Sequence, residues 1–157
     1  MYSICAMNVI DFIIQDTELN FANFFHTCRQ VPADKQDWRP LDNGRSTLDQ
    51  AQEVAICPLW VPGLLQAKGY DPSIFGDFET AKASLPDLDA CEAAAKENLM
   101  KLIEACKAFP EADYQTEVEF PWGKYTFLQT MTFASWNANY HMGQVSYIQT
   151  LYGDQSM

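Results

Sequence analysis

The chain is poor in basic residues and in histidine. Its 157 residues include 10 Lys and Arg against 21 Asp and Glu, which gives a formal net charge of −11, and only two histidines. Nucleic-acid binding draws its affinity from clustered Lys and Arg, whereas the basic residues here are scattered along the chain. We therefore expect no nucleic-acid partner. The acidic excess is typical of solvated helix faces and says little about a substrate.

Long apolar runs and export signals are also missing. The longest apolar stretch, Val54 to Leu65, is short for a membrane span and is interrupted by Pro58, Pro62 and Gly63. The first residues lack the basic cluster that opens a secretory signal. We expect a cytoplasmic protein without a membrane partner.

Cysteine spacings that bind metals or carry redox chemistry are absent. The five cysteines contain no Cys-x-x-Cys pair and are spread along the chain as Cys5, Cys28, Cys57, Cys91 and Cys106. They are expected to be small apolar core residues in a reducing compartment. No Gly-rich phosphate loop or nucleophile elbow is present either. The length predicts a single domain over residues 1–157.

Apolar residues recur at helical spacing in four long segments. These predict helices from Met7 to Gln30, from Thr47 to about Cys57, from Pro86–Asp87 to Phe109, and from Thr126 to Tyr152. Thr47 and Thr126 each begin a sequence with capping-box form. Pro58 is expected to end or kink the second helix.

The connections between these segments predict the fold class. The part between the second and third helices is broken by Pro and Gly, with one short helix expected around Phe78 to Ser84. The segment from Tyr114 to Lys124 is expected to be an extended connector rather than a paired strand. Four amphipathic helices without a convincing sheet predict an all-α four-helix bundle with a long crossover connection.

The last helix carries a polar stripe. Asn137, His141, Gln144 and Ile148 follow one another at offsets of four, three and four, which places them on one helix face. A neighbouring stripe, also expected to point inward, contains Phe133, Trp136, Tyr140, Tyr147 and Leu151. Polar side chains on an inward face need partners.

One interpretation of this stripe is a metal site. Side chains at i and i+4 lie one above the other on a helix, so Asn137 and His141 can present an oxygen and a nitrogen to one ion. An amide oxygen is a weak ligand, so this pair would bind a metal less tightly than two histidines unless a carboxylate also contributes. Glu53, in the increasingly apolar end of the second helix, is the candidate carboxylate.

The other interpretation is a polar network without an ion. A hydrogen bond or ion pair between Glu53 and His141, completed by Asn137 and Gln144, would satisfy the same groups. The residues alone favour this network, and both interpretations stay open. His26, the only other histidine, lies beside the apolar stripe of the first helix and is expected to be structural rather than a ligand.

The segment from Tyr140 to Ile148 resembles the His-x-Gly-Gln signature of the DinB/YfiT-like superfamily. Weaker similarity extends to the segments Val31–Lys35, Trp38–Pro40 and Gly44–Leu48. The resemblance implies a DinB-like four-helix bundle, often dimeric, with a long crossover. It also implies three metal ligands, one from the second helix and two from the last.

By position, the resemblance assigns the metal ligands to Glu53, Asn137 and His141. Two of the three positions depart from the family's histidines. The implied cofactor is one divalent ion, Zn, Ni, Mn or Fe, and the implied activity is a thiol-dependent transferase or hydrolase type acting on a small-molecule or thiol substrate. The implied partner is a second copy of the chain. The alternative is a non-catalytic binding or interaction protein whose metal site has become a polar core network.

Overall fold

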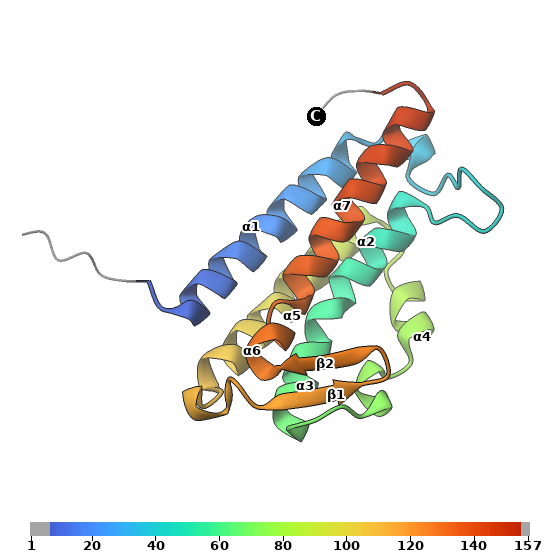
Figure 1. Ribbon diagram of the computed structural model, residues 1–157. Coiled ribbons are helices and arrows are strands. Elements are labelled where there is room, and N and C mark those ends of the chain that lie inside the picture. Colours follow the sequence, from blue (N-terminus) through green and yellow to red (C-terminus); the bar gives the residue numbers. More distant parts are fainter. Residues whose placement is uncertain (1–6, 155–157) are drawn as a thin grey trace, which may run out of the picture.

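The computed structural model describes residues 7–154, and four long helices form its body (Figure 1). They are α1 (Val9–Gln30), α2 (Thr47–Ile56), α5 (Leu88–Ala108) and α7 (Phe133–Leu151). Helix α1 packs along α7, α2 packs along α5, and α2 also contacts α7. The predicted four-helix bundle is confirmed, and the connection from α2 to α5 is the long crossover.

Helices α1 and α5 begin within two residues of the predicted starts, at Val9 and Leu88. The Asn8 side chain accepts a hydrogen bond from the Asp11 N–H at 2.8 Å, and Asp87 accepts one from the Ala90 N–H at 2.8 Å. Such caps satisfy N–H groups that have no partner within the helix. Helix α1 ends at Gln30 because Val31 precedes a proline and adopts an extended backbone.

The start of α2 corrects the prediction by one residue. Ser46, not Thr47, is the cap, since its Oγ accepts a hydrogen bond from the Asp49 N–H at 3.2 Å. Ser46 has an extended backbone, whereas Thr47 is already helical. The hydroxyl of Thr47 is buried and has no hydrogen-bond partner among residues 7–154.

The chain beyond α2 is more helical than expected. Pro58 lies in a 3₁₀ turn, η2 (Cys57–Leu59), that leads directly into the unpredicted helix α3 (Trp60–Ala67). Pro62 is tolerated in the first turn of α3, where backbone N–H groups lack intrahelical acceptors. The expected short helix is present as α4 (Phe78–Ala83). Further 3₁₀ turns are η1 (Ala33–Lys35), η3 (Pro72–Phe75) and η4 (Glu111–Asp113).

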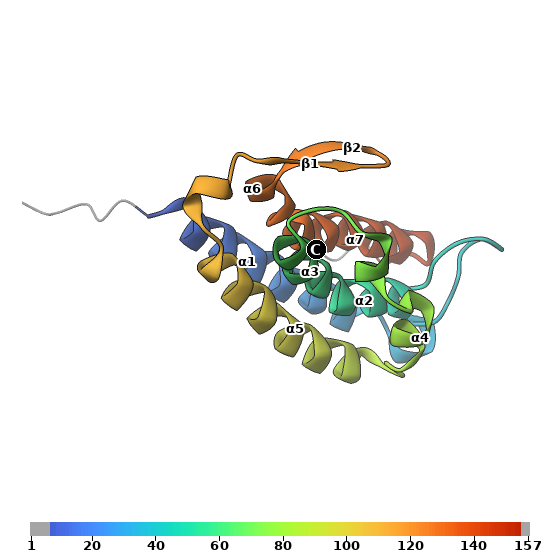
Figure 2. The ribbon, with the colours of Figure 1, turned by 90° about the horizontal axis from the view of Figure 1, so that it is seen from below.

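The connector before the last helix is a β-hairpin, so the prediction of an unpaired segment was wrong. Strand β1 (Glu117–Phe120) pairs antiparallel with β2 (Gly123–Thr126), with Phe120 opposite Gly123. Val118 and Phe120 are buried while Glu117 and Glu119 are exposed, the alternation of a half-buried strand. The hairpin lies at the end of the bundle where α7 begins, next to α6 (Figure 2).

The predicted last helix is divided in two. The capping box of Thr126 and Gln129 is present, but it opens only the short helix α6 (Phe127–Thr130), and α7 begins at Phe133. The expected inward aromatic stripe is also wrong, because four of its members are between 48% and 66% exposed: Trp136, Tyr140, Tyr147 and Leu151. The buried face instead holds Ala134 and Ala138, whose small side chains let α7 approach its neighbours closely.

The structure also bears on the expectations for the cysteines and for a membrane span. Cys28, Cys57, Cys91 and Cys106 are buried free thiols, and burial raises the pKa of Cys91 and Cys106 to about 12. Cys5 lies outside the described residues. Over residues 7–154, no helix is both long and apolar enough to cross a bilayer.

Candidate metal centre

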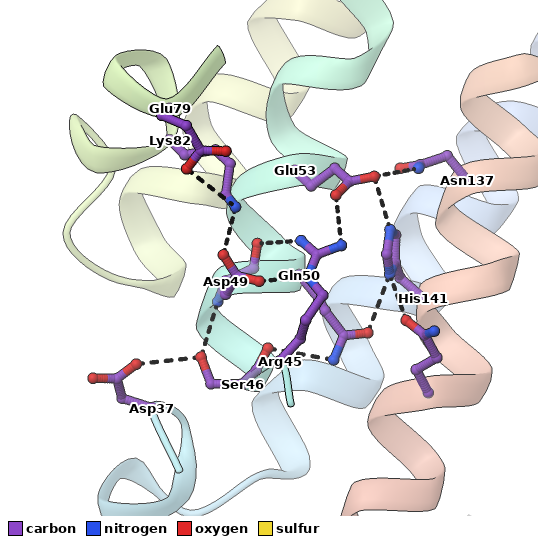
Figure 3. Close-up of polar contacts among 11 residues, drawn as sticks. Asp37, Arg45, Ser46, Asp49, Gln50, Glu53, Glu79, Lys82, Asn137 and His141 are labelled. Carbon is purple, nitrogen blue, oxygen red and sulfur yellow. Dashed lines mark hydrogen bonds and ion pairs between the residues drawn. The ribbon is translucent and has the colours of Figure 1, made fainter. Parts of the chain in front are cut away.

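The three predicted ligands meet at one carboxylate oxygen between α2 and α7 (Figure 3). Asn137 Nδ2 donates a hydrogen bond to Glu53 Oε1 at 2.9 Å, and His141 Nε2 lies 3.0 Å from the same oxygen. Asn137 is 5% exposed and His141 2% exposed. The sequence pattern therefore identified three side chains that the fold brings into direct contact.

Two glutamines hold the ring of His141. Its Nδ1 lies 2.8 Å from Gln144 Oε1 and 3.1 Å from Gln50 Oε1. Both atoms are acceptors, so Nδ1 carries a proton, and Nε2 faces the carboxylate of Glu53 with either a lone pair or a second proton. Nε2 lies 3.0 Å from Glu53 Oε1. Two acceptor atoms at that separation need a proton or a cation between them.

The second oxygen of Glu53 has a cationic partner. Arg45 donates to Glu53 Oε2 at 2.6 Å and also pairs with Asp49, which in turn binds the buried Lys82 (Figure 3). Burial alone would raise the pKa of Glu53, but the hydrogen bonds from His141 and Asn137 and the charge of Arg45 outweigh it and lower the pKa to about 2. Glu53 is therefore a carboxylate at neutral pH.

Glu53, Asn137 and His141 offer donor atoms that fit a divalent ion, although as a set of three they are weak ligands. Asn137 Oδ1 is buried without a hydrogen-bond partner among the described residues, and an unpaired buried acceptor is costly unless something ligates it. Within residues 7–154, no group of three or more His, Cys, Asp and Glu could hold a metal.

The sequence reasoning missed Arg45 and Gln50 as members of this site. A signal for Arg45 was available, because Arg45, Asp49 and Glu53 follow one another at spacings of four, which favours ion pairs on a helix. Nothing in the sequence indicated that Gln50 faces His141. His26 is exposed on α1, where its Nε2 lies 3.3 Å from Gln30 Nε2.

No protein-family model matches the chain, and no curated protein matches it. Solved structures do. The chain is similar to YfiT from Bacillus subtilis, described as a probable metal-dependent hydrolase with an unusual four-helix bundle topology, at 12% identity and a TM-score of 0.71, over 98% of this chain and 94% of that one.

Two further structures are similar over 92% of this chain. One is a DinB-like protein, YjoA, from Bacillus subtilis, with 13% identity, a TM-score of 0.66 and 94% of its chain covered. The other is a mycothiol-dependent maleylpyruvate isomerase, with 13% identity, a TM-score of 0.62 and 63% of its chain covered. These similarities show that the chain has a DinB/YfiT-like fold.

Proposed function

We propose that Glu53, Asn137 and His141 hold one divalent metal ion, and that the protein is a metal-dependent enzyme of the thiol-dependent transferase or hydrolase type. One observation carries this proposal: His141 Nε2 lies 3.0 Å from the ionised Glu53, while Nδ1 lies against two amide oxygens, so that a proton or a metal ion has to lie between Nε2 and Glu53. Metal-binding histidines are commonly fixed in this way through their other nitrogen. Zinc, nickel, manganese and iron all accept such nitrogen and oxygen ligands.

Each surrounding residue would have a distinct role. Gln50 and Gln144 fix the tautomer and orientation of His141, and Arg45 holds the Glu53 carboxylate by its second oxygen. A metal ion bound there would lower the pKa of a water or stabilise a thiolate. Asn137 would supply its unpaired Oδ1 after rotation of its amide.

The structural neighbours support this class of function. Their shared fold includes one protein described as a probable metal-dependent hydrolase and one described as a mycothiol-dependent isomerase. On this basis a small-molecule or thiol substrate is the proposed partner.

The test is metal content of protein purified without chelator. We expect about one zinc, nickel, manganese or iron per chain, and a lower melting temperature after EDTA. His141→Gln should weaken metal binding at least about tenfold, since loss of a ligand exceeds the effect of losing its supporting contacts. His26→Gln, which changes the only other histidine, is the matched control and should bind like the wild type. A metal-free protein that ignores both chelator and added metal would contradict the proposal.

A second candidate function is a non-catalytic binding or interaction protein. The ion pair from Arg45 to Glu53 favours it, because Arg45 already supplies positive charge to this carboxylate. Here a proton on Nε2 replaces the metal. His141→Ala would then cost about 1–3 kcal/mol of unfolding free energy by leaving Glu53 without this partner, and the loss would be the same with and without metal.

A further inference from the structure

A cavity of about 640 Å³ lies between the hairpin, α3 and the first turns of α7. Its lining consists mainly of aromatic rings: Trp60, Phe75, Phe120, Trp122, Tyr125, Phe133 and Trp136. Cavities of roughly 300–1,000 Å³ with apolar walls are typical sites for small molecules. The lining also includes Asn137, so the cavity adjoins the candidate metal centre.

The aromatic walls of this cavity are held in place by one another. Trp60 packs edge-on against Phe75 with ring centroids 5.1 Å apart, and Tyr125 packs edge-on against Phe133 at 5.2 Å. These contacts connect separate elements, namely α3 with η3 and the hairpin with α7. A cavity whose walls are already fixed loses little entropy when a ligand enters.

The absence of charged residues and the many aromatic rings in the lining restrict the charge of a ligand that can bind there. Among the described residues, none that lines the cavity carries a charge, and its polar members are Cys57, Gln129, Thr132 and Asn137. The whole chain has a net charge of −11. The faces of aromatic rings attract cations and repel anions.

We propose that this cavity binds a neutral or cationic aromatic small molecule. The idea that this molecule is the substrate rests on the proposed metal-dependent function. The idea that the cavity binds it does not. Trp136 is the residue best suited to a test, because it lines the cavity yet is 64% exposed, so its removal leaves the core intact. Met100 is 59% exposed on α5 and does not line this cavity.

The experiment is a ligand-observed NMR titration of metal-free protein with tryptamine, indole and indole-3-acetate. These probes share one ring system and are cationic, neutral and anionic. Absence of metal prevents a carboxylate–metal bond from contributing. We expect saturable binding of tryptamine and indole, with the anion bound at least about fivefold more weakly. Trp136→Ala should weaken binding roughly tenfold, and Met100→Ala should not change it.

Three results would overturn the proposal: no saturable binding by protein that is folded by circular dichroism, tightest binding of indole-3-acetate, or equal loss of binding in the two variants. The outcome is independent of the metal measurements. If the protein binds aromatic molecules but no metal, the cavity is a binding site for them, but it is not the substrate site of a metal-dependent enzyme.

Discussion

Glu53 accepts hydrogen bonds on both carboxylate oxygens, and its protonation would weaken all of them. Its Oε1 faces Asn137 and His141, and its Oε2 accepts from Arg45. The side chain is only 16% exposed, so water cannot easily replace these partners. The negative charge of Glu53 therefore contributes strongly to the strength of its contacts with Asn137, His141 and Arg45, with or without a metal.

The low pKa of Glu53 predicts a specific acid sensitivity in metal-free protein. Its pKa is lowered from 4.5 to about 2 on folding, so its contribution to stability is complete above pH 4.5 and is lost as the pH falls toward 2. The shift corresponds to about 3 kcal/mol at most. Unfolding in urea at pH 5 and pH 3 should show a larger loss for the wild type than for Glu53→Gln. Equal losses would contradict the predicted role of the carboxylate.

Asn137 is the weakest of the three proposed ligands, and a stronger one should improve the site. Asn137→His would offer an imidazole nitrogen next to His141, one turn away on α7. We expect zinc to bind at least about tenfold more tightly, as measured by competition with a chromophoric chelator. Asn139→His, on the exposed side of the same helix, is the matched control. If the two variants bind zinc equally, Asn137 does not contribute to the site.

At the scale of the element, helix α2 positions Glu53 and Gln50 and depends on its N-terminal cap. Ser46→Ala should cost about 1 kcal/mol of unfolding free energy, because the Asp49 N–H loses its acceptor. Thr47→Val keeps the shape of the side chain and removes a buried hydroxyl that has no partner among the described residues, so it should be neutral or stabilising. Urea unfolding of the two variants measures both effects. The reverse order would show that Thr47 is the cap.

The elements that sequence reasoning predicted correctly are those whose ends are fixed locally. Asp87 and the capping box of Thr126 and Gln129 are side chains that bond their own helix, and both were identified without the fold, although the capping box opens α6 rather than the whole last helix. The hairpin and α3 were missed because their stability comes from burial against distant segments. Phe120 is buried beside Tyr70 and Phe133, which no local pattern reveals.

The same distinction explains the site. Helical spacing placed Asn137 and His141 on one face of α7, and the family resemblance paired them with Glu53. The polar stripe was correctly placed on the inward side of α7, but the neighbouring aromatic stripe was not, because the exposed face of this helix carries larger apolar side chains than its buried face. Small residues such as Ala138 are buried there by the close approach of neighbouring helices, a property of the assembled bundle.

At the scale of the whole molecule, the exposed apolar residues Tyr140, Tyr147 and Leu151 of α7 form the surface that most needs a partner. An exposed apolar patch of this kind marks interaction surfaces in many proteins, and we propose that it forms the interface of a homodimer. Tyr147→Glu should convert dimer to monomer in analytical ultracentrifugation. Met100→Glu adds the same charge at a 59% exposed apolar residue on α5 and should leave the dimer intact. A monomeric wild type would exclude this interface.

The most direct test of the metal centre is a crystal structure of the wild-type protein soaked in zinc, with diffraction data on both sides of the zinc absorption edge. The proposal predicts one anomalous peak about 2.0–2.2 Å from His141 Nε2 and Glu53 Oε1, with the Asn137 amide rotated so that its oxygen faces the peak. Absence of a peak, with His141 Nε2 still in direct contact with Glu53, would contradict it.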